Sequence, residues 1–331
     1  MFSYILGRFA VMIPTLFVIS VVTFIIIQLP PGDYLTTYAA QLREQGDEVD
    51  EVLMARLERR YGLGQPQHIQ YLKWISGILL EGDWGESMLF QKPVSELIWD
   101  RLGLTFILSF TTLLFGWLVS IPLGVYSATH QYSVIDYIVT ALNFIGKGLP
   151  EFMLALVIMW LVTVYTKMSV GGLFSPEYMD APWTLDRLLD LLAHVWIPIV
   201  ILAVGSTANG IRITRANLLD ELNKPYVETA RAKGVKETRL IWKYPTRVAL
   251  NPFFSTVGWS LADLISGTTI VAIVLSLQTT GPMLFTALIN QDMFLAGSFI
   301  MMLSVLTVIG TLLSDLLLAW VDPRIRLEEM A

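Results

Sequence analysis

The sequence predicts an all-α polytopic membrane protein, and three observations lead to that prediction. Of the 331 residues, 54% are apolar and only 15% are charged, whereas soluble domains carry about 25% charged residues. The mean hydropathy is +0.61. The charged residues are bunched and leave long apolar stretches between them, and aromatic residues make up 11% of the chain, as expected for a protein with aromatic belts at the membrane interfaces.

Six apolar stretches are long enough to cross about 30 Å of hydrocarbon as helices. They comprise approximately residues 9–29, 103–129, 137–166, 191–211, 248–276 and 293–320. The first stretch is followed by Leu-Pro-Pro-Gly32 and has no small-residue cleavage site, so we expect an uncleaved span and not a secretory signal.

The distribution of basic residues predicts the orientation of the spans. A basic loop, residues 212–247, contains Arg212, Arg215, Lys224, Arg231, Lys233, Lys236, Arg239, Lys243 and Arg247. Short loops rich in Lys and Arg stay in the cytoplasm. With six spans, the N-terminus and the C-terminus are then cytoplasmic as well, in a multi-pass protein of the cell inner membrane.

The chain divides into three regions on this interpretation. Residues 1–29 form an N-terminal segment with the first span. Residues 30–101, with more acids than bases, form an extracytoplasmic subdomain. Residues 102–331 form a core of five transmembrane helices that includes the basic loop.

Two helices are expected inside the extracytoplasmic region. The first covers Val49–Tyr61 and ends at Gly62. The second covers His68–Leu80, where apolar and polar residues alternate at helical spacing. Such an amphipathic helix lies on the bilayer or on the other spans.

No enzymatic motif is found. The histidines, His68, His130 and His194, are far apart in sequence, and the chain has no cysteine, so metal sites with ordinary spacing and thiol chemistry are excluded. Gly146-Lys147 lacks the upstream glycine of a Walker A loop. We therefore expect a non-enzymatic chain that binds no cofactor or metal and has no nucleic-acid partner.

Local signals within the basic loop predict two short helices. Asn223-Lys-Pro225 can start a helix over Tyr226–Lys233, and Gly234 can end it in the left-handed conformation. A second helix, about Thr238–Lys243, stops before Pro245. The pair forms either a docking site for another protein or an ordinary basic loop.

The residues of this loop also resemble a known family. Glu228-Thr-Ala230 followed by Gly234 resembles the E-A-A-x-x-x-G coupling motif of ABC importer permeases, and the segment from Thr229 to Gly234 resembles its form in dipeptide, oligopeptide and nickel permeases. Further matches in the same order are Pro31-Gly-Asp33, Tyr61-Gly-Leu63 with Pro66 and Tyr71, Gly82-Asp-Trp-Gly85 with Ser87, Arg212-Ile-Thr-Arg215 and Asp322-Pro-Arg-Ile-Arg326.

The resemblance implies a type I ABC importer permease of the first-permease type. Such a chain forms half of the translocation pathway for an oligopeptide, an oligosaccharide or a nickel complex. Its implied partners are a second, different permease, two ATPase subunits that use ATP and Mg, an extracytoplasmic solute-binding protein and the lipid bilayer. The implied ATPase-coupling residues are Tyr226, Glu228, Thr229, Ala230, Arg231, Ala232, Lys233 and Gly234.

The chain departs from this family at four places. Tyr244 stands where a histidine is usual, and Pro245 is unusual at its position. Residues 272–282 replace the usual acid and P-G-I-G run, and Glu151 stands where a serine is usual. The departure in residues 272–282 leaves the outer gate and the substrate class open.

Charges inside the apolar stretches are the second candidate site. Lys147 and Glu151 are four residues apart, so a helix would place them on one face. Gly146, Gly148 and Pro150 would loosen the helix there and resemble the broken helices that line transport cavities. Asp263 is the third such charge. Each costs about 2.5 to 3.5 kcal/mol near the bilayer centre, so we expect them to line a translocation path, to face the partner permease or to form structural pairs.

Two other functions remain open on the sequence. An ion-coupled secondary transporter would use Lys147, Glu151 and Asp263 as a relay, although such transporters usually have repeated halves. A membrane scaffold would use the basic loop to bind anionic lipid.

Overall fold

The computed structural model describes residues 2–29, 39, 55, 58, 64–87, 89–166, 171–179, 181–258, 260, 263 and 268–321. The helix expected over Val49–Tyr61 lies outside these residues, apart from residues 55 and 58, which are helical. The motif matches at 31–33, 61–63 and 322–326 lie outside them as well.

Four helices in the described part of the chain are long and apolar enough to cross a membrane, and a bent pair raises the number to five if it is counted as one span. They confirm that the first, second, fourth and sixth apolar stretches are helical. The long helices are α1 (Phe2–Gln28), α5 (Val94–Thr129), α8 (Leu185–Leu222) and α16 (Met293–Val321), and the bent pair is α6 (Val134–Gly148) with α7 (Glu151–Thr166).

Short elements connect the long helices. Strands β1 and β2 form an antiparallel hairpin in which Ser87 pairs with Lys92. The short elements are α4 (Gln67–Ser76), η1 (Gly77–Glu81), β1 (Glu86–Ser87), β2 (Lys92–Pro93), η2 (Pro176–Tyr178), α9 (Pro225–Ala232), α10 (Glu237–Lys243), α11 (Pro245–Ala249), α12 (Asn251–Ser255), α14 (Thr269–Val274) and α15 (Thr280–Ile289).

The fifth apolar stretch differs from the prediction. Where a single helix was expected over 248–276, the described residues form the short helices α11, α12 and α14. Pro245 and Pro252 each occupy the start of one of these helices, because proline fits the first turn but lacks the N–H that a continuous helix requires.

The chain folds into two compact units. The first unit contains Met1–Ile5, Leu104–Pro282 and Thr307–Ala331, and the second contains Leu6–Gly103 and Met283–Leu306. Helices α5 and α16 each contribute to both units.

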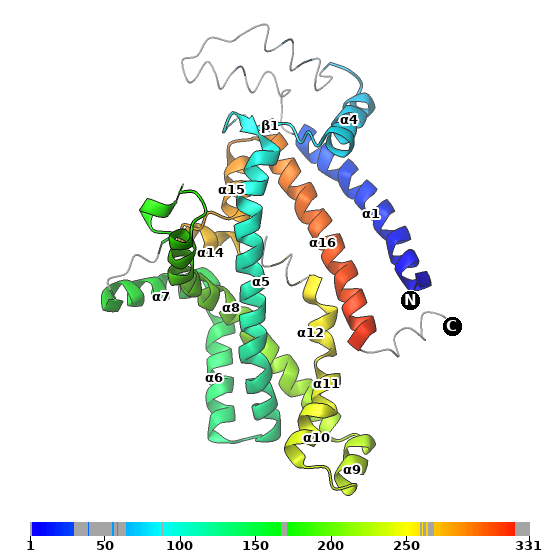
Figure 1. Ribbon diagram of the computed structural model, residues 1–331, viewed down its shortest axis with the longest axis vertical. Coiled ribbons are helices and arrows are strands. Elements are labelled where there is room, and N and C mark those ends of the chain that lie inside the picture. The colour runs from blue at the N-terminus through cyan, green and yellow to red at the C-terminus, as the bar shows by residue number, and fades with distance from the viewer. Residues whose placement is uncertain are drawn as a thin grey trace. The chain divides into compact units, whose positions relative to one another are not determined.

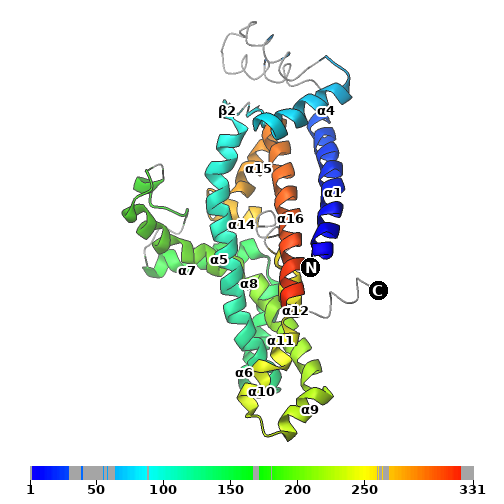
Figure 2. The ribbon, with the colours of Figure 1, turned by 45° about the vertical axis from the view of Figure 1, so that its right-hand side comes forward.

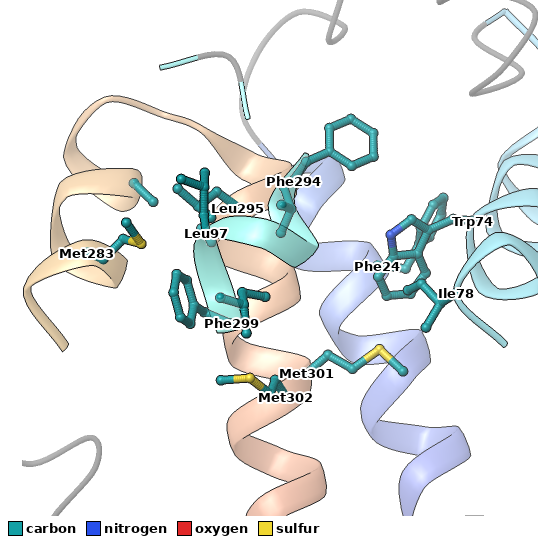
Figure 3. Close-up of a cluster of buried hydrophobic side chains, with 14 residues drawn as sticks. Phe24, Trp74, Ile78, Leu97, Met283, Phe294, Leu295, Phe299, Met301 and Met302 are labelled. Carbon is teal, nitrogen blue, oxygen red and sulfur yellow. The ribbon is translucent and has the colours of Figure 1, made fainter. Parts of the chain in front are cut away.

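The second unit is held by an apolar cluster from α1, α4, α5 and α16. Figure 3 shows Phe24 of α1 beside Trp74 and Ile78, and the Phe24 and Trp74 ring centroids are 5.9 Å apart. The Ser20 and Tyr71 hydroxyls lie 2.7 Å apart and join the same two helices. The amphipathic helix expected at His68–Leu80 is therefore confirmed, with one face packed on α1.

A buried carboxylate organises the hairpin of the second unit. Asp292, which is fully buried, accepts hydrogen bonds from the Ser87 hydroxyl at 2.5 Å, the Leu89 N–H at 3.1 Å and the Leu295 N–H at 3.2 Å. Its side chain thus caps the start of α16 and fixes the hairpin loop to it.

The first unit contains the bent pair, α8 and the basic loop. Its largest apolar cluster is formed by side chains of α5, α7, α8, α14 and the loop at 173–174, including the fully buried Leu275. Figures 1 and 2 both show α9 and α10 at the end of this unit next to α11.

Candidate functional site

A cavity of about 700 Å³ lies within the first unit. Helices α5, α6, α7 and α8 contribute its walls, together with Pro252, Phe253, Thr256, Ser260, Asp263 and Thr268. The three charges expected inside the membrane, Lys147, Glu151 and Asp263, all line it. The fold thus brings Asp263 to the same cavity as Lys147 and Glu151, although it is 112 positions from Glu151 in the sequence.

The wall that carries Lys147 and Glu151 is a broken helix. Helices α6 and α7 meet at 108°, and Figure 1 shows the sharp turn between them. Leu149 has φ −99° and ψ 137°, the extended conformation that a following proline imposes, and Pro150 follows it. The stretch 137–166 is therefore not one continuous helix, because Pro150 ends the first helix, but the bent pair counts as one span when its two helices are taken together.

The break also corrects the relation between the two charges. Lys147 belongs to α6 and Glu151 to α7, so they do not share a helix face. The Lys147 ammonium instead donates to the side-chain oxygen of Asn209 on α8, at 3.2 Å. Arg212 donates to the same oxygen at 3.2 Å. In the part of the chain that the structure describes, Lys147 and Glu151 therefore form no ion pair.

Two glycines allow the broken helix to approach α8 closely. A Cβ atom at Gly205 would lie 2.5 Å from Oε1 of Glu151, and one at Gly146 would lie 3.1 Å from Val204. The Glu151 carboxylate therefore rests directly on the backbone of α8. Any larger residue at 205 would displace it.

A buried ion pair links α6 to α8, and the sequence interpretation did not identify it. Asp136 accepts from Arg215 Nη2 at 3.0 Å and Nε at 3.1 Å, and also from the Tyr132 N–H at 3.0 Å. Its side chain is 4% exposed. Arg215 lies on α8 and not in a loop. The sequence feature that pointed to Arg215 was the Arg212-Ile-Thr-Arg215 motif, but it did not indicate that Arg215 pairs with Asp136.

The second candidate site is the first helix of the basic loop. Helix α9 starts with Pro225 and ends before Gly234, whose φ is +77°. The Gly234 N–H donates to Arg231 O and the Val235 N–H donates to Ala230 O, which is the Schellman arrangement. The predicted helix and its left-handed glycine are confirmed, and α10 confirms the second short helix.

Helix α9 is attached by one face and presents the other to solvent. Val227 is fully buried, whereas Glu228, Thr229, Arg231 and Gly234 are exposed. The other residues of the coupling prediction are exposed or half-buried, namely Tyr226, Ala230, Ala232 and Lys233. The residues assigned to ATPase contact thus form one accessible surface.

Two polar contacts fix the ends of this surface. Arg231 and Glu237 form an ion pair at 2.6 Å that joins α9 to α10. The hydrogen bond from Arg231 lowers the pKa of Glu237, and the same contact raises the pKa of Arg231. The Tyr226 hydroxyl donates to Glu221 at 2.5 Å, and burial followed by this hydrogen bond raises the pKa of Tyr226.

Metal ligands do not converge at either site. Among the described residues, no group of three His, Cys, Asp or Glu side chains is placed to hold a metal ion.

Two family models together match most of the chain. Residues 120–327 match the family of the binding-protein-dependent transport system inner membrane component. Residues 1–109 match the N-terminal family of binding-protein-dependent transport system membrane components.

Named relatives match over almost their whole length. The chain is 34% identical to the oligopeptide transport system permease protein AppB of Bacillus subtilis (strain 168), over 98% of this chain and 99% of that protein. It is 30% identical to the dipeptide transport system permease protein DppB of Escherichia coli (strain K12), over 98% and 99%.

A solved structure supports the fold. A chain of the MetNI methionine ABC transporter, in an inward-facing conformation, superposes with a TM-score of 0.54 at 18% identity. The match covers 68% of this chain and 96% of the other.

Proposed function

The chain belongs to the family of binding-protein-dependent transport system inner membrane components, and from that premise we propose that it imports peptides. It is an all-helical, multi-pass inner-membrane permease subunit of the ABC importer type, a family whose permeases are not catalytic. The observation that carries the choice of solute is the match to AppB and DppB, whose names specify oligopeptide and dipeptide transport. The oligosaccharide alternative has no such support.

The proposal includes the topology and the regions of the chain. Six spans with cytoplasmic termini, an extracytoplasmic subdomain over 30–101 and a core over 102–331 agree with the basic residues of 212–247 lying on one side. The four long helices and the bent pair account for five of these spans. The sixth corresponds to the stretch around α12 and α14.

The basic loop is proposed to couple ATP hydrolysis to transport. Helix α9 has the features that transmission requires, because it is rigidly capped, anchored by Val227 and exposed over the remaining surface. A partner that grips this surface and closes on ATP can move the attached helices between two arrangements. ATP and Mg are used by two partner ATPase subunits, and an extracytoplasmic binding protein supplies the solute.

The cavity is proposed as this chain's share of the translocation path, completed by a second and different permease. Charged residues within a membrane cost energy and are retained where they face a cavity or a partner. Lys147, Glu151 and Asp263 meet this condition. Family membership favours ATP-driven import over an ion-coupled relay by the same three residues.

Reconstitution tests the proposed function directly. Proteoliposomes containing this chain, its second permease and its ATPases should take up a labelled peptide only when ATP and the binding protein are both supplied. Uptake driven by a proton or sodium gradient without ATP would overturn the proposal and favour the ion-coupled alternative.

Cross-linking tests the coupling surface. The chain has no cysteine, so a single introduced cysteine is unambiguous. Glu228→Cys should cross-link to an ATPase subunit with a yield that changes when ATP binds, whereas Lys92→Cys, exposed in the hairpin of the second unit, should not. Equal yields at the two positions would contradict an ATPase contact at α9.

A further inference from the structure

Among the described residues, the charged side chains at the cavity are not paired with one another. Three charged side chains line it, two acidic and one basic, and Arg212 adds a second positive charge at Asn209. Lys147 is held by the neutral Asn209, and in the described part of the chain neither Glu151 nor Asp263 forms an ion pair. The two carboxylates line the same cavity.

The cavity is therefore electrically polarised. Lys147 and Arg212 both donate to Asn209, which places positive charge at that point of α8. The carboxylates belong to Glu151 at the start of α7 and to Asp263. A solute in a low-dielectric passage interacts with such charges more strongly than it would in water, so its own charge affects how readily it passes.

We propose that Glu151 and Asp263 favour the passage of peptides that carry a Lys or Arg side chain. The inference rests on the proposed peptide-import function and adds the chemical class of the preferred peptide. Two carboxylates that form no ion pair among the described residues attract such a side chain and repel an acidic one. Lys147 and Arg212 keep their positive charge and oppose this preference, but their bonds to Asn209 hold them at α8 and not on the carboxylates.

Gly205 is the positioning residue for this selectivity. Its missing side chain lets the Glu151 carboxylate rest on α8 at the cavity wall, where a Cβ would lie only 2.5 Å from Oε1. A substitution at Gly205 therefore moves the carboxylate without removing its charge. That gives a second, independent way to disturb the same group.

The experiment compares transport of three matched peptides. The complete importer in proteoliposomes, with ATP and its binding protein, is given Ala-Lys-Ala, Ala-Gln-Ala or Ala-Glu-Ala. Each peptide is pre-bound to the binding protein at saturation, so that selection by that protein is removed. The readout is the ratio of Lys-peptide to Glu-peptide uptake, which does not depend on how much functional importer is present.

Glu151→Gln and Asp263→Asn should each lower this ratio about fivefold, the effect expected for one charge interaction in a partly hydrated site. Lys147→Met should raise it. Gly205→Ala should lower it less than Glu151→Gln does. Asp186→Asn is the matched control, because this exposed carboxylate starts α8 and does not line the cavity, and the ratio should stay at its wild-type value.

The outcomes separate the two proposals. Uptake of all three peptides with a ratio unchanged in Glu151→Gln and Asp263→Asn would overturn the charge selectivity and leave peptide import standing. Absence of ATP-driven uptake for every peptide in the wild-type importer would overturn peptide import itself. If a variant also lowers uptake of the neutral peptide, the ratio of Lys-peptide to Glu-peptide uptake still tests the charge selectivity, because a general loss of activity lowers both uptakes equally.

Discussion

Two ion pairs of similar chemistry hold the bundle and the basic loop, but their surroundings differ. Asp136 and Arg215 join α6 to α8 at 3.0 Å, with side chains 4% and 29% exposed. Arg231 and Glu237 join α9 to α10 at 2.6 Å, with side chains 51% and 53% exposed. The shorter contact is the one exposed to solvent, so the distance between the charged atoms does not show which pair stabilises the fold more. Burial shows it, because solvent and salt screen the exposed pair much more than the buried pair.

The largest expected effect is at the buried pair. Asp136→Ala leaves Arg215 without its carboxylate and should destabilise the chain by about 3 kcal/mol. The measurement is the thermal unfolding midpoint in detergent. Asp220→Ala, an exposed carboxylate on the same α8 helix, should have little effect. Equal midpoints for the two variants would contradict a stabilising role of the buried pair.

A backbone change in the loop should have an intermediate effect. Gly234 has φ +77° and open space where a Cβ would lie, so substitution costs backbone strain and not a steric clash. Gly234→Val should cost about 1 to 2 kcal/mol and reduce ATP-driven uptake, whereas Gly234→Asn should retain uptake because asparagine tolerates this conformation. Similar losses in both variants would mean that the left-handed turn is not what matters.

The smallest effect on stability is expected at the exposed pair. A double-mutant cycle of Arg231→Ala and Glu237→Gln should give a coupling energy much smaller than the loss expected at the buried pair, because solvent screens both charges. The coupling should fall further at high salt. A value as large as that of the buried pair would contradict the comparison.

The exposed pair also predicts a pH dependence. Because Arg231 lowers the pKa of Glu237, the contribution of the pair is present above the unfolded-state pKa of about 4.3. It is lost as the pH falls through the folded-state pKa. The difference in unfolding midpoint between wild type and Glu237→Gln should therefore shrink below about pH 4.3 and be constant at neutral pH. A difference that keeps its neutral-pH size as the pH falls below the unfolded-state pKa would contradict this assignment.

The loop was predictable in detail because its signals are local. Pro225 and Gly234 each act on the backbone at their own positions, and the structure confirms the helix between them. The long apolar helices were predictable for the same reason, since length and composition suffice.

The cavity and the buried pair were not predictable, because they depend on which segments pack together. Glu151 and Gly205 are 54 positions apart, and Asp136 and Arg215 are 79 apart. The loosening effect of Gly146, Gly148 and Pro150 could be read from the sequence, but a bend of 108° could not.

The break at Leu149-Pro150 also affects how the passage tolerates mutation. The Leu149 N–H bonds to Ile145 O, and the next donors that return to the chain, Met153 and Leu154, both use Pro150 O. The first N–H groups of α7 have no acceptor within their own helix. These main-chain groups depend on the break itself and not on the side chains around it. Substitutions elsewhere in the cavity wall leave them in place, whereas a substitution of Pro150 could let the helix continue and remove them.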